Sequence, residues 1–456
     1  MVIEEALIIV DTLISPSHLN SLQETIFRQC WDGKSYEEIA AMSGYTADYI
    51  RVTGSQLWQV LSEATGEKIT KHKLRSTLRQ WKEEWQIGQQ LEQSPQESSS
   101  SAFTNSELPI VELPDGPVPL NSRFYLERFG VEERCYREIT KPGALIRIKA
   151  SSHWGKTSLA LRILNHARSL DLQTAHLNFQ QIDRSLLSSL DKFMRWFCAH
   201  LSQQLQLDFR LDEYWDVDLG SKASCTNYLQ YYLLPRMNTS LVLVMDEINR
   251  IFESPIVAQD FLPLLRFWHE ESKHEEIWEK LRMIVSYSTE ILIPLNCNQS
   301  PFNVGLPIVL QAFSAEQIEE LAQRHELKWH SPESQTKSLM ALQKLTQGHP
   351  YLIRLALYHL AQRHVGFGQL IREAPTETGI YGSHLRELLT VLESQPDLAQ
   401  LFKQVVMADG PIRLEPLATY KLASLGLIRQ IGNEVLPICE LYRFYFRDRL
   451  HHDAIR

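Results

Sequence analysis

The chain has 456 residues, 44% hydrophobic and 22% charged, the composition of a globular protein with about three domains. Its formal net charge of −9 excludes a nucleic-acid-binding surface spread over the whole molecule. The six cysteines include no Cys-x-x-Cys pair, which argues against zinc and against a disulfide framework and favours reduced, buried thiols.

The N-terminal stretch is apolar, but its charges do not predict a secretory signal. Residues 1–11 carry Glu4, Glu5 and Asp11 and no basic residue, whereas a signal peptide begins with positive charge. No apolar run in the sequence approaches the length that crosses a membrane. We therefore expect a cytoplasmic protein without membrane contact.

Residues 1–88 have the pattern of a compact all-α domain. Ser35 and Glu38 form a capping-box pattern at the start of one helix. Gly44 predicts the turn after this helix, and Thr46 predicts the N-cap of the next. Two helices joined by so short a turn predict a helix-turn-helix domain.

This domain resembles the vMAP module, which is fused to ATPase domains in multigene bacterial conflict systems. Residues 1–90 contain nine Lys and Arg against twelve Asp and Glu, whereas DNA-binding domains place a basic patch at the phosphates. The presumed recognition helix carries only Arg51, with Asp48 beside it, and the one basic run is Lys68–Lys82. We expect residues 1–88 to dock a protein partner, an effector encoded nearby. DNA binding is the alternative.

Residues 89–121 are predicted to be a flexible linker, in which Pro109–Pro114 can lie as an extended strand along the domain that follows. Gln, Glu, Ser and Pro dominate the stretch from Gln89 to Ser101, and such a composition cannot bury a core.

A phosphate-binding loop is predicted between a short apolar strand at 144–149 and a helix. The loop reads Ala-Ser-Ser-His-Trp-Gly-Lys-Thr-Ser over 150–158, and the N–H groups of a helix N-terminus favour anions. In this pattern Lys156 reaches the β- and γ-phosphates, and the Thr157 hydroxyl binds Mg²⁺. Ala150 stands where the pattern has its first glycine, so the assignment also needs support from the sequence downstream of the loop.

Two further apolar runs support the assignment. The run Leu241–Met245 ends in Asp246 and Glu247; we expect Asp246 to hold the Mg²⁺ shell and Glu247 to polarise the attacking water. A third run ends in the hydroxyls of Ser288 and Thr289, where a sensor residue would contact the γ-phosphate or the water. An ordinary buried strand is the alternative for this third run.

From about Pro117 to Gly368 the chain resembles the bacterial AAA-like ATPase domain, a relative of the signal-transduction (STAND) and origin-recognition ATPases. The family also often lacks the first loop glycine. The matching blocks begin at Ser122, Gly143, Gly155, Asp246, Asp260, Ser300 and Gly348. The resemblance implies ATP rather than GTP, held by the loop residues Trp154, Gly155, Lys156, Thr157 and Ser158. It also implies an adenine pocket formed by the segment at Tyr125 and by the turn at His349 and Pro350.

Hydrolysis in this lineage often uses an arginine from a neighbouring subunit. Arg250 and Arg266 are the candidates for such an arginine finger, and a surface ion pair is the alternative for each. A nucleotide-dependent homo-oligomer is compatible with this expectation.

The remaining sequence predicts two mainly helical parts. A capping-box pattern at Ser314 begins a helical lid over 313–375. Gly432 and Asn433 between alternating apolar residues predict a β-hairpin, and hence a C-terminal winged helix over 376–456. The expected fold is therefore an α/β P-loop ATPase core over 122–312 with a helical lid, flanked by an N-terminal helix-turn-helix domain and a C-terminal winged helix.

Three functions agree with these patterns. The first is a slowly hydrolysing, ATP-dependent signal-transduction switch in a bacterial conflict or defence system, whose output comes from a partner because no protease or nuclease pattern is present. The second is an ATP-dependent DNA-binding transcription regulator. The third is an adaptor that binds nucleotide without turnover.

Overall fold

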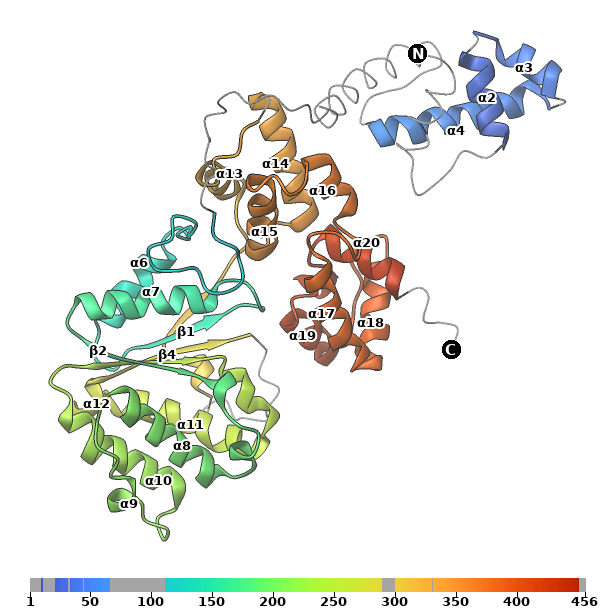
Figure 1. Cartoon of the computed structure of the whole chain (residues 1–456). Helices are drawn as coiled ribbons and strands as arrows, with labels where there is room; N and C mark the ends of the chain where they lie inside the picture. Colours follow the sequence, from blue (N-terminus) through green and yellow to red (C-terminus); the bar gives the residue numbers. More distant parts are fainter. Residues whose placement is uncertain are drawn as a thin grey trace, which may run out of the picture. The chain divides into compact units, whose positions relative to one another are not determined.

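The computed structural model describes residues 10, 21–31, 33–43, 45–65, 111–288, 300–329 and 331–450. The chain divides into two compact units, Met1–Asn105 and Ser106–Arg456. Figure 1 shows the helices and strands of both units. No helix among these residues is long and apolar enough to span a lipid bilayer.

The first unit is a small helical domain. Its helices are α2 (Ser21–Trp31), α3 (Tyr36–Ser43) and α4 (Ala47–Thr65). The predicted capping box before α3 is confirmed, because Ser35 N–H donates to Glu38 Oε2 at 2.6 Å and Glu38 N–H donates to Ser35 Oγ at 3.2 Å. Trp58 of α4 donates its indole N–H to the Tyr36 hydroxyl at 2.7 Å, which fixes α4 against α3. The predicted turn residue Gly44 lies outside the described residues.

The second unit is built on a parallel five-stranded sheet, in the order β2-β3-β4-β1-β5. The strands are β1 (Leu145–Lys149), β2 (Gln173–Asn178), β3 (Leu241–Asp246), β4 (Leu281–Tyr287) and β5 (Leu306–Val309). Strands β1 and β4 are neighbours in the sheet although β2 and β3 lie between them in the chain. Because the strands are parallel, each connection must cross over one face of the sheet. The predicted strands before the loop, before Asp246 and before Ser288 are confirmed.

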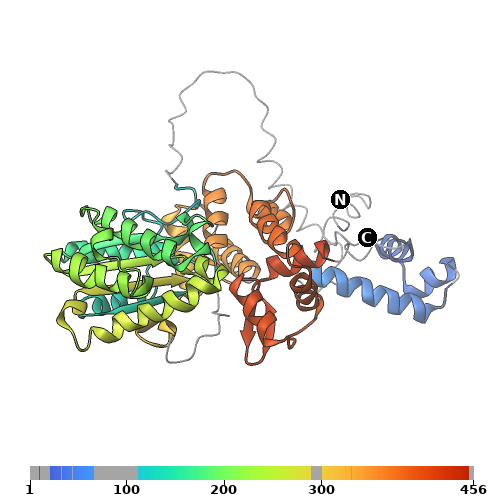
Figure 2. The ribbon, with the colours of Figure 1, turned by 90° about the horizontal axis from the view of Figure 1, so that it is seen from below.

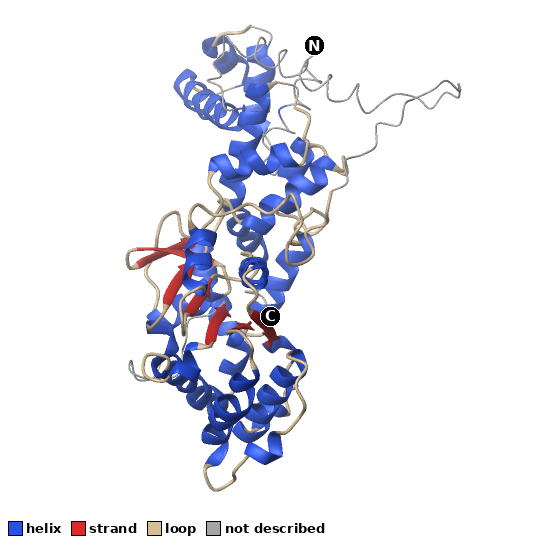
Figure 3. Ribbon diagram, turned by 90° about the vertical axis from the view of Figure 1, so that its left-hand side faces the viewer, coloured by secondary structure: helices blue, strands red, loops and turns tan. Residues whose placement is uncertain are grey.

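Alternation along the strands gives the sheet two apolar faces. On one face Ile146, Val244 and Ile284 pack with residues of α6 (Val131–Ile139) and α7 (Lys156–Ser169). On the other face Leu243 and Met283 pack with a larger helical layer. The helices of that layer are α8 (Leu190–Gln204), α9 (Leu211–Tyr214), α10 (Gly220–Asn227), α11 (Pro255–Glu271) and α12 (Glu276–Glu279). The result is a three-layer α/β sandwich, with the strands drawn in red in Figure 3.

The rest of the second unit is mainly helical and shares one apolar core. Its helices are α13 (Ala315–Arg324), α14 (Pro332–Thr346), α15 (Pro350–Ala361), α16 (Phe367–Glu373), α17 (Gly382–Glu393), α18 (Pro396–Met407), α19 (Pro416–Ser424) and α20 (Glu440–Arg449). The capping box at Ser314 is present, with Gln317 as its partner. Ile353 of α15 and Phe402 of α18 belong to the same buried cluster, so these helices pack as one body, drawn in orange and red in Figure 2.

The predicted hairpin is confirmed. Strands β6 (Ile428–Ile431) and β7 (Glu434–Pro437) pair antiparallel around Gly432 and Asn433. Gly432 adopts φ +61°, a left-handed conformation that glycine reaches without a Cβ clash.

Residues 111–121 are bound to the second unit, as we expected for the segment up to Pro114 but not for the rest, which we assigned to the flexible linker. Val118 N–H donates to Ser158 Oγ at 2.9 Å, and the Arg162 guanidinium donates to the carbonyls of Val118 and Pro119 at 3.0 and 2.8 Å. Glu112 pairs with Arg354 of α15 at 3.2 Å. We call residues 111–119 the strap, because they connect α7 to α15.

Candidate nucleotide site

The loop between β1 and α7 has a defined backbone shape. His153 and Gly155 adopt φ +63° and +90°, and α7 begins directly after the loop, at Lys156. Arg128 donates from Nη2 to the Trp154 carbonyl at 2.7 Å, which fixes the loop from outside. The first N–H groups of α7 have no partners within the helix, so the loop presents a positive end for an anion.

Lys156 carries a buried ammonium group at the base of this loop. Its side chain is 4% exposed and lies 3.5 Å from Glu247 Oε1. It also donates to the Ser151 carbonyl at 3.2 Å. The ammonium is therefore positioned between the loop backbone and a carboxylate, close to the N-terminus of α7.

Asp246 lies at the end of β3 and accepts hydrogen bonds from two neighbouring elements. Thr157 Oγ1 donates to its Oδ2 at 2.7 Å, and Ser286 Oγ donates to its Oδ1. His176 Nε2 lies 3.7 Å from Oδ2. Burial favours the neutral acid, but the neighbouring His176 and the hydrogen bonds from Ser286 and Thr157 outweigh it, so the pKa of Asp246 falls below its ordinary value.

Glu247 follows Asp246 in a left-handed conformation, with φ +55°. Its backbone N–H donates to Asp246 Oδ1 at 3.1 Å, while its side chain lines the pocket beside Lys156. A non-glycine residue at positive φ costs free energy. The Asp246 carboxylate therefore points inward to Thr157, whereas the Glu247 carboxylate faces the pocket.

A pocket of about 600 Å³ adjoins the loop. Seven of the predicted site residues line it: Tyr125, Gly155, Lys156, Thr157, Ser158, Glu247 and Pro350. Four apolar side chains, Phe124, Leu126, Phe313 and Leu321, also line it, and we call this part of the lining its apolar end. A pocket lined by both charged and apolar side chains has the character that the phosphates and the base of a nucleotide require.

Tyr125 is held rigidly at this pocket. Its hydroxyl donates to Glu132 Oε1 at 2.6 Å, and the Arg162 guanidinium lies 3.4 Å from the centroid of its ring. Burial and the adjacent Glu132 raise the pKa of Tyr125. The hydroxyl and one face of the ring are therefore already in contact with Glu132 and Arg162, and only the rest of the ring is available to a ligand in the pocket.

The turn before Pro350 depends on a glycine. Gly348 adopts φ +72°, and a Cβ at this position would lie 2.4 Å from the Phe313 carbonyl oxygen. Phe313 N–H in turn donates to the Gly348 carbonyl at 2.8 Å. The close approach places Phe313 and Pro350 together at the apolar end of the pocket.

Among the predicted nucleotide- and metal-binding residues that the structure describes, four do not line the pocket. Trp154 and His349 pack against each other with ring centroids 5.1 Å apart, and burial lowers the pKa of His349 well below its ordinary value. Asp246 lies behind Thr157, fully buried. Ser288 is buried, and its N–H donates to Asn249 Oδ1 at 3.2 Å. Thr289 lies outside the described residues.

Both candidate arginine fingers make contacts within their own chain. Arg250 pairs with Glu253. Arg266 pairs with Glu270 at 2.8 Å and donates to Asn303 Oδ1 at 2.6 Å. Neither residue lines the pocket.

Sequence reasoning missed Arg128, His176 and Ser286. Ser286 belongs to the third apolar run, for which we predicted only the hydroxyls at the end, Ser288 and Thr289. The strand pairing identifies Ser286: Met245 of β3 is paired with Val285 of β4, so the residue of β4 level with Asp246 is Ser286.

Comparisons with known proteins agree with this geometry. A sequence model of the family described as "AAA-like domain" matches residues 113–448. A second model, described as "vWA-MoxR associated protein N-terminal HTH", matches residues 1–81. No curated protein sequence matches the chain.

Solved structures are similar to this chain at low sequence identity. A Walker-type ATPase of Pyrococcus abyssi superposes with a TM-score of 0.50 and 13% identity, covering 71% of this chain and 96% of its own. The ORC2 protein of Aeropyrum pernix, in its ADPNP–ADP complexes, gives a TM-score of 0.46 and 14% identity, covering 75% of this chain and 97% of its own. Cdc6p of Pyrobaculum aerophilum gives 0.38 and 14%, covering 74% of this chain and 98% of its own.

Proposed function

The chain belongs to the AAA-like domain family, and from this premise we propose that its second unit binds ATP with Mg²⁺ and hydrolyses it slowly, as a switch that acts through partner proteins. One observation carries the proposal: Thr157 of the loop is hydrogen-bonded to Asp246 at 2.7 Å, with Lys156 and Glu247 3.5 Å apart beside them. These four side chains come from the loop and the end of β3, and they supply the charges that phosphates and a metal require.

In the proposed complex each residue has one role. Lys156 neutralises the β- and γ-phosphates, and Glu247 orients the attacking water. The residues that would hold Mg²⁺ are Thr157 and Asp246. Their hydroxyl and carboxylate oxygens are the donors that this hard cation prefers, and the low pKa of Asp246 keeps the carboxylate ionised. When bound, Mg²⁺ neutralises the phosphate charge. We assign the base to the apolar end beside Tyr125 and Pro350.

The switch is proposed to act through the C-terminal elements, which we interpret as a winged helix over 376–456. Ser151 of the loop donates from Oγ to the Ala423 carbonyl of α19 at 3.1 Å. A Cβ on Gly426, in the turn after α19, would lie 3.0 Å from the Ser151 side chain. Because the loop contacts these elements so closely, a change in its shape on phosphate binding would displace them.

The first unit is proposed to dock a protein partner. On its described surface Arg51 pairs with Glu37 at 2.9 Å and with Asp48 at 2.8 Å, so its charge is already compensated. Large apolar side chains are exposed nearby: Met42, Tyr45, Tyr49 and Val52. Exposed tyrosines are typical of protein interfaces. The matching N-terminal family is described as associated with vWA and MoxR, and we propose an effector of that kind, encoded nearby, in a bacterial conflict system.

DNA binding by a transcription regulator is the second candidate, because the matching N-terminal family is described as a helix-turn-helix. A nucleotide-dependent homo-oligomer is a further part of the proposal. To act as a finger in a neighbouring subunit, Arg250 would have to leave Glu253, or Arg266 would have to leave Glu270 and Asn303.

A calorimetric titration with ATP, ADP and GTP, with and without Mg²⁺, tests the nucleotide assignment. We expect ATP and ADP to bind, ATP more tightly with Mg²⁺, and GTP to bind more weakly. Phosphate release measured in the same samples separates the switch from an adaptor without turnover. A chain that binds none of the three nucleotides would refute the assignment.

A further inference from the structure

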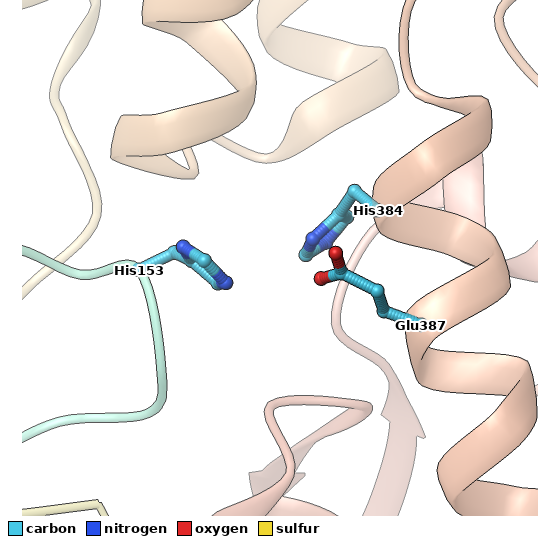
Figure 4. A group of neighbouring side chains, drawn as sticks. All are labelled: His153, His384 and Glu387. Atoms are coloured by element: carbon cyan, nitrogen blue, oxygen red, sulfur yellow. The ribbon is translucent and has the colours of Figure 1, made fainter. Parts of the chain in front are cut away.

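Three side chains with metal-binding atoms meet at one wall of the pocket: His153, His384 and Glu387. Their ligand atoms all lie within 4.8 Å of one another. Figure 4 shows His153 reaching from the loop towards His384 and Glu387, which project from the same side of α17. The i, i+3 spacing of the last two residues places them on one helix face.

The two imidazoles are held in place by neighbouring rings. His384 Nε2 lies 2.5 Å from the Tyr442 hydroxyl, which leaves Nδ1 as its available ligand atom. The Tyr351 ring lies 4.9 Å from the ring of His153 and 5.3 Å from that of His384. An outer hydrogen bond that fixes the orientation of an imidazole is a regular feature of metal-ligating histidines.

The chemistry of the three groups favours a transition-metal cation. His384 is buried and has one ring nitrogen at the Tyr442 hydroxyl, which leaves the other nitrogen as an electron-pair donor for a metal. A phosphate is disfavoured here, because the Glu387 carboxylate would repel it. Mg²⁺ is disfavoured as well, because it prefers oxygen donors, whereas two imidazoles and one carboxylate suit Zn²⁺.

We propose that His153, His384 and Glu387 form a binding site for one zinc-type dication, separate from the Mg²⁺ site assigned to Thr157 and Asp246. The cysteine spacing that speaks against a thiolate zinc site does not apply to these imidazole and carboxylate ligands. A tetrahedral zinc ion holds its ligands about 3.4 Å apart, from bonds of about 2.0–2.1 Å. The ligand atoms within 4.8 Å of one another are therefore wider apart than a bound zinc ion would hold them, and zinc binding would draw in the exposed Glu387 carboxylate.

The proposed site has two structural consequences. Three protein ligands leave a fourth position open, and because all three residues line the pocket, that position takes a water or an oxygen of a pocket ligand. The metal also ties the loop that holds His153 to α17, two segments more than 200 residues apart in the sequence.

Zinc binding is tested on the full chain, purified without a polyhistidine tag, by titration against a chromogenic chelator. We expect one zinc ion per chain, not displaced by excess Mg²⁺, and a visible absorption band when Co²⁺ replaces zinc. Absence of zinc binding, or displacement of the zinc by Mg²⁺, would overturn the proposal.

Variants locate the site. Glu387→Gln and His153→Ala each remove one exposed ligand, and each should lower zinc affinity by more than about tenfold. The matched control is His359→Ala with His364→Ala, a surface pair whose Nδ1 atoms are 3.3 Å apart, and it should leave the affinity unchanged. If the control loses zinc while Glu387→Gln and His153→Ala retain it, the metal binds elsewhere.

A fourth variant separates this proposal from the nucleotide assignment. Lys156→Ala should retain zinc, because Lys156 is not among the three ligands. Loss of zinc in a folded Lys156→Ala chain would contradict a separate site, whereas loss of ATP alone would leave the zinc proposal intact.

Discussion

Lys156 places a buried positive charge between the loop backbone and Glu247, beside the pocket. Its ammonium is 4% exposed and contacts the Ser151 carbonyl and Glu247. We expect Lys156→Ala to abolish ATP binding, because charged hydrogen bonds to phosphate contribute about 1.5–3 kcal/mol each. Lys141→Ala, which removes an exposed lysine paired with Glu138, is the control. Calorimetry that gives wild-type ATP affinity for Lys156→Ala would disprove the phosphate-loop assignment.

Glu247 and Asp246 are adjacent carboxylates with different surroundings. Asp246 is enclosed by hydroxyls from Thr157 and Ser286, whereas Glu247 faces the pocket. Glu247→Gln should therefore keep ATP and Mg²⁺ binding and reduce hydrolysis by about 10²–10⁴-fold, since only the carboxylate that orients water is lost. Single-turnover phosphate release measures the effect, and a normal rate would move the role to another acid.

Gly348 gives a prediction on stability. Alanine at φ +72° is strained by about 1–3 kcal/mol, and its Cβ would also overlap the Phe313 carbonyl oxygen at 2.4 Å. Gly348→Ala should lower the free energy of unfolding by at least this amount and weaken ATP binding at the apolar end. Gly410→Ala is the control, because its Cβ meets no atom within 4 Å. Equal denaturation midpoints for the two variants would contradict the steric argument.

At the scale of elements, much of the sheet could be predicted and the side-chain contacts between strands could not. The strands before the loop and before Asp246 are apolar runs of the right length, so pattern alone located them. Ser286 was missed because its contact with Asp246 requires β4 to lie beside β3, and a sheet order of β2-β3-β4-β1-β5 is not encoded in any local pattern. The hairpin at Gly432 was predictable, since its turn residues are adjacent in the chain.

The strap shows the other limit of sequence reasoning. Its composition resembles a linker, but the hydrogen bonds that hold it go from its backbone to Ser158 and Arg162. Backbone groups are present in every residue, so composition does not reveal such binding. The residues that line the pocket over 114–118 therefore belong to the folded unit, although they fall within the predicted linker.

Truncation tests this boundary. A chain that begins at Ser106 should keep the stability and ATP affinity of the second unit. A chain that begins at Leu120 loses the bonds to Ser158 and Arg162 and the Glu112–Arg354 pair, so it should unfold at a lower temperature and bind ATP more weakly. Differential scanning calorimetry compares the two. Identical melting profiles would mean that the strap does not contribute to the fold.

For the whole molecule, the two units differ in what they can contact. In the second unit, charged side chains such as Lys156 line a pocket that suits an anionic ligand. The described part of the first unit instead exposes the side chains of Tyr45 and Tyr49. In the described part of the first unit, Arg51 is paired with Glu37 and Asp48, so its charge is not free for a phosphate. This difference agrees with our proposal that the second unit binds nucleotide and the first unit docks a protein partner.

The final prediction concerns residues 1–88 as an isolated domain. Cleavage within Ser98–Ser101 should release them folded, because domain boundaries fall in polar segments that bury no core. Their circular dichroism should then show the helices of the intact chain.

We expect the released domain to bind duplex DNA no more tightly than about 1 μM at physiological salt, the range of non-specific contacts. A DNA reader that neutralises several phosphates would instead bind tightly at low salt, and its affinity would fall steeply as salt is added. Fluorescence anisotropy with mixed-sequence and genomic duplexes at low and physiological salt distinguishes the two. Tight binding that persists at physiological salt would make the transcription regulator the preferred function, with the basic run Lys68–Lys82 as the first place to remove charge.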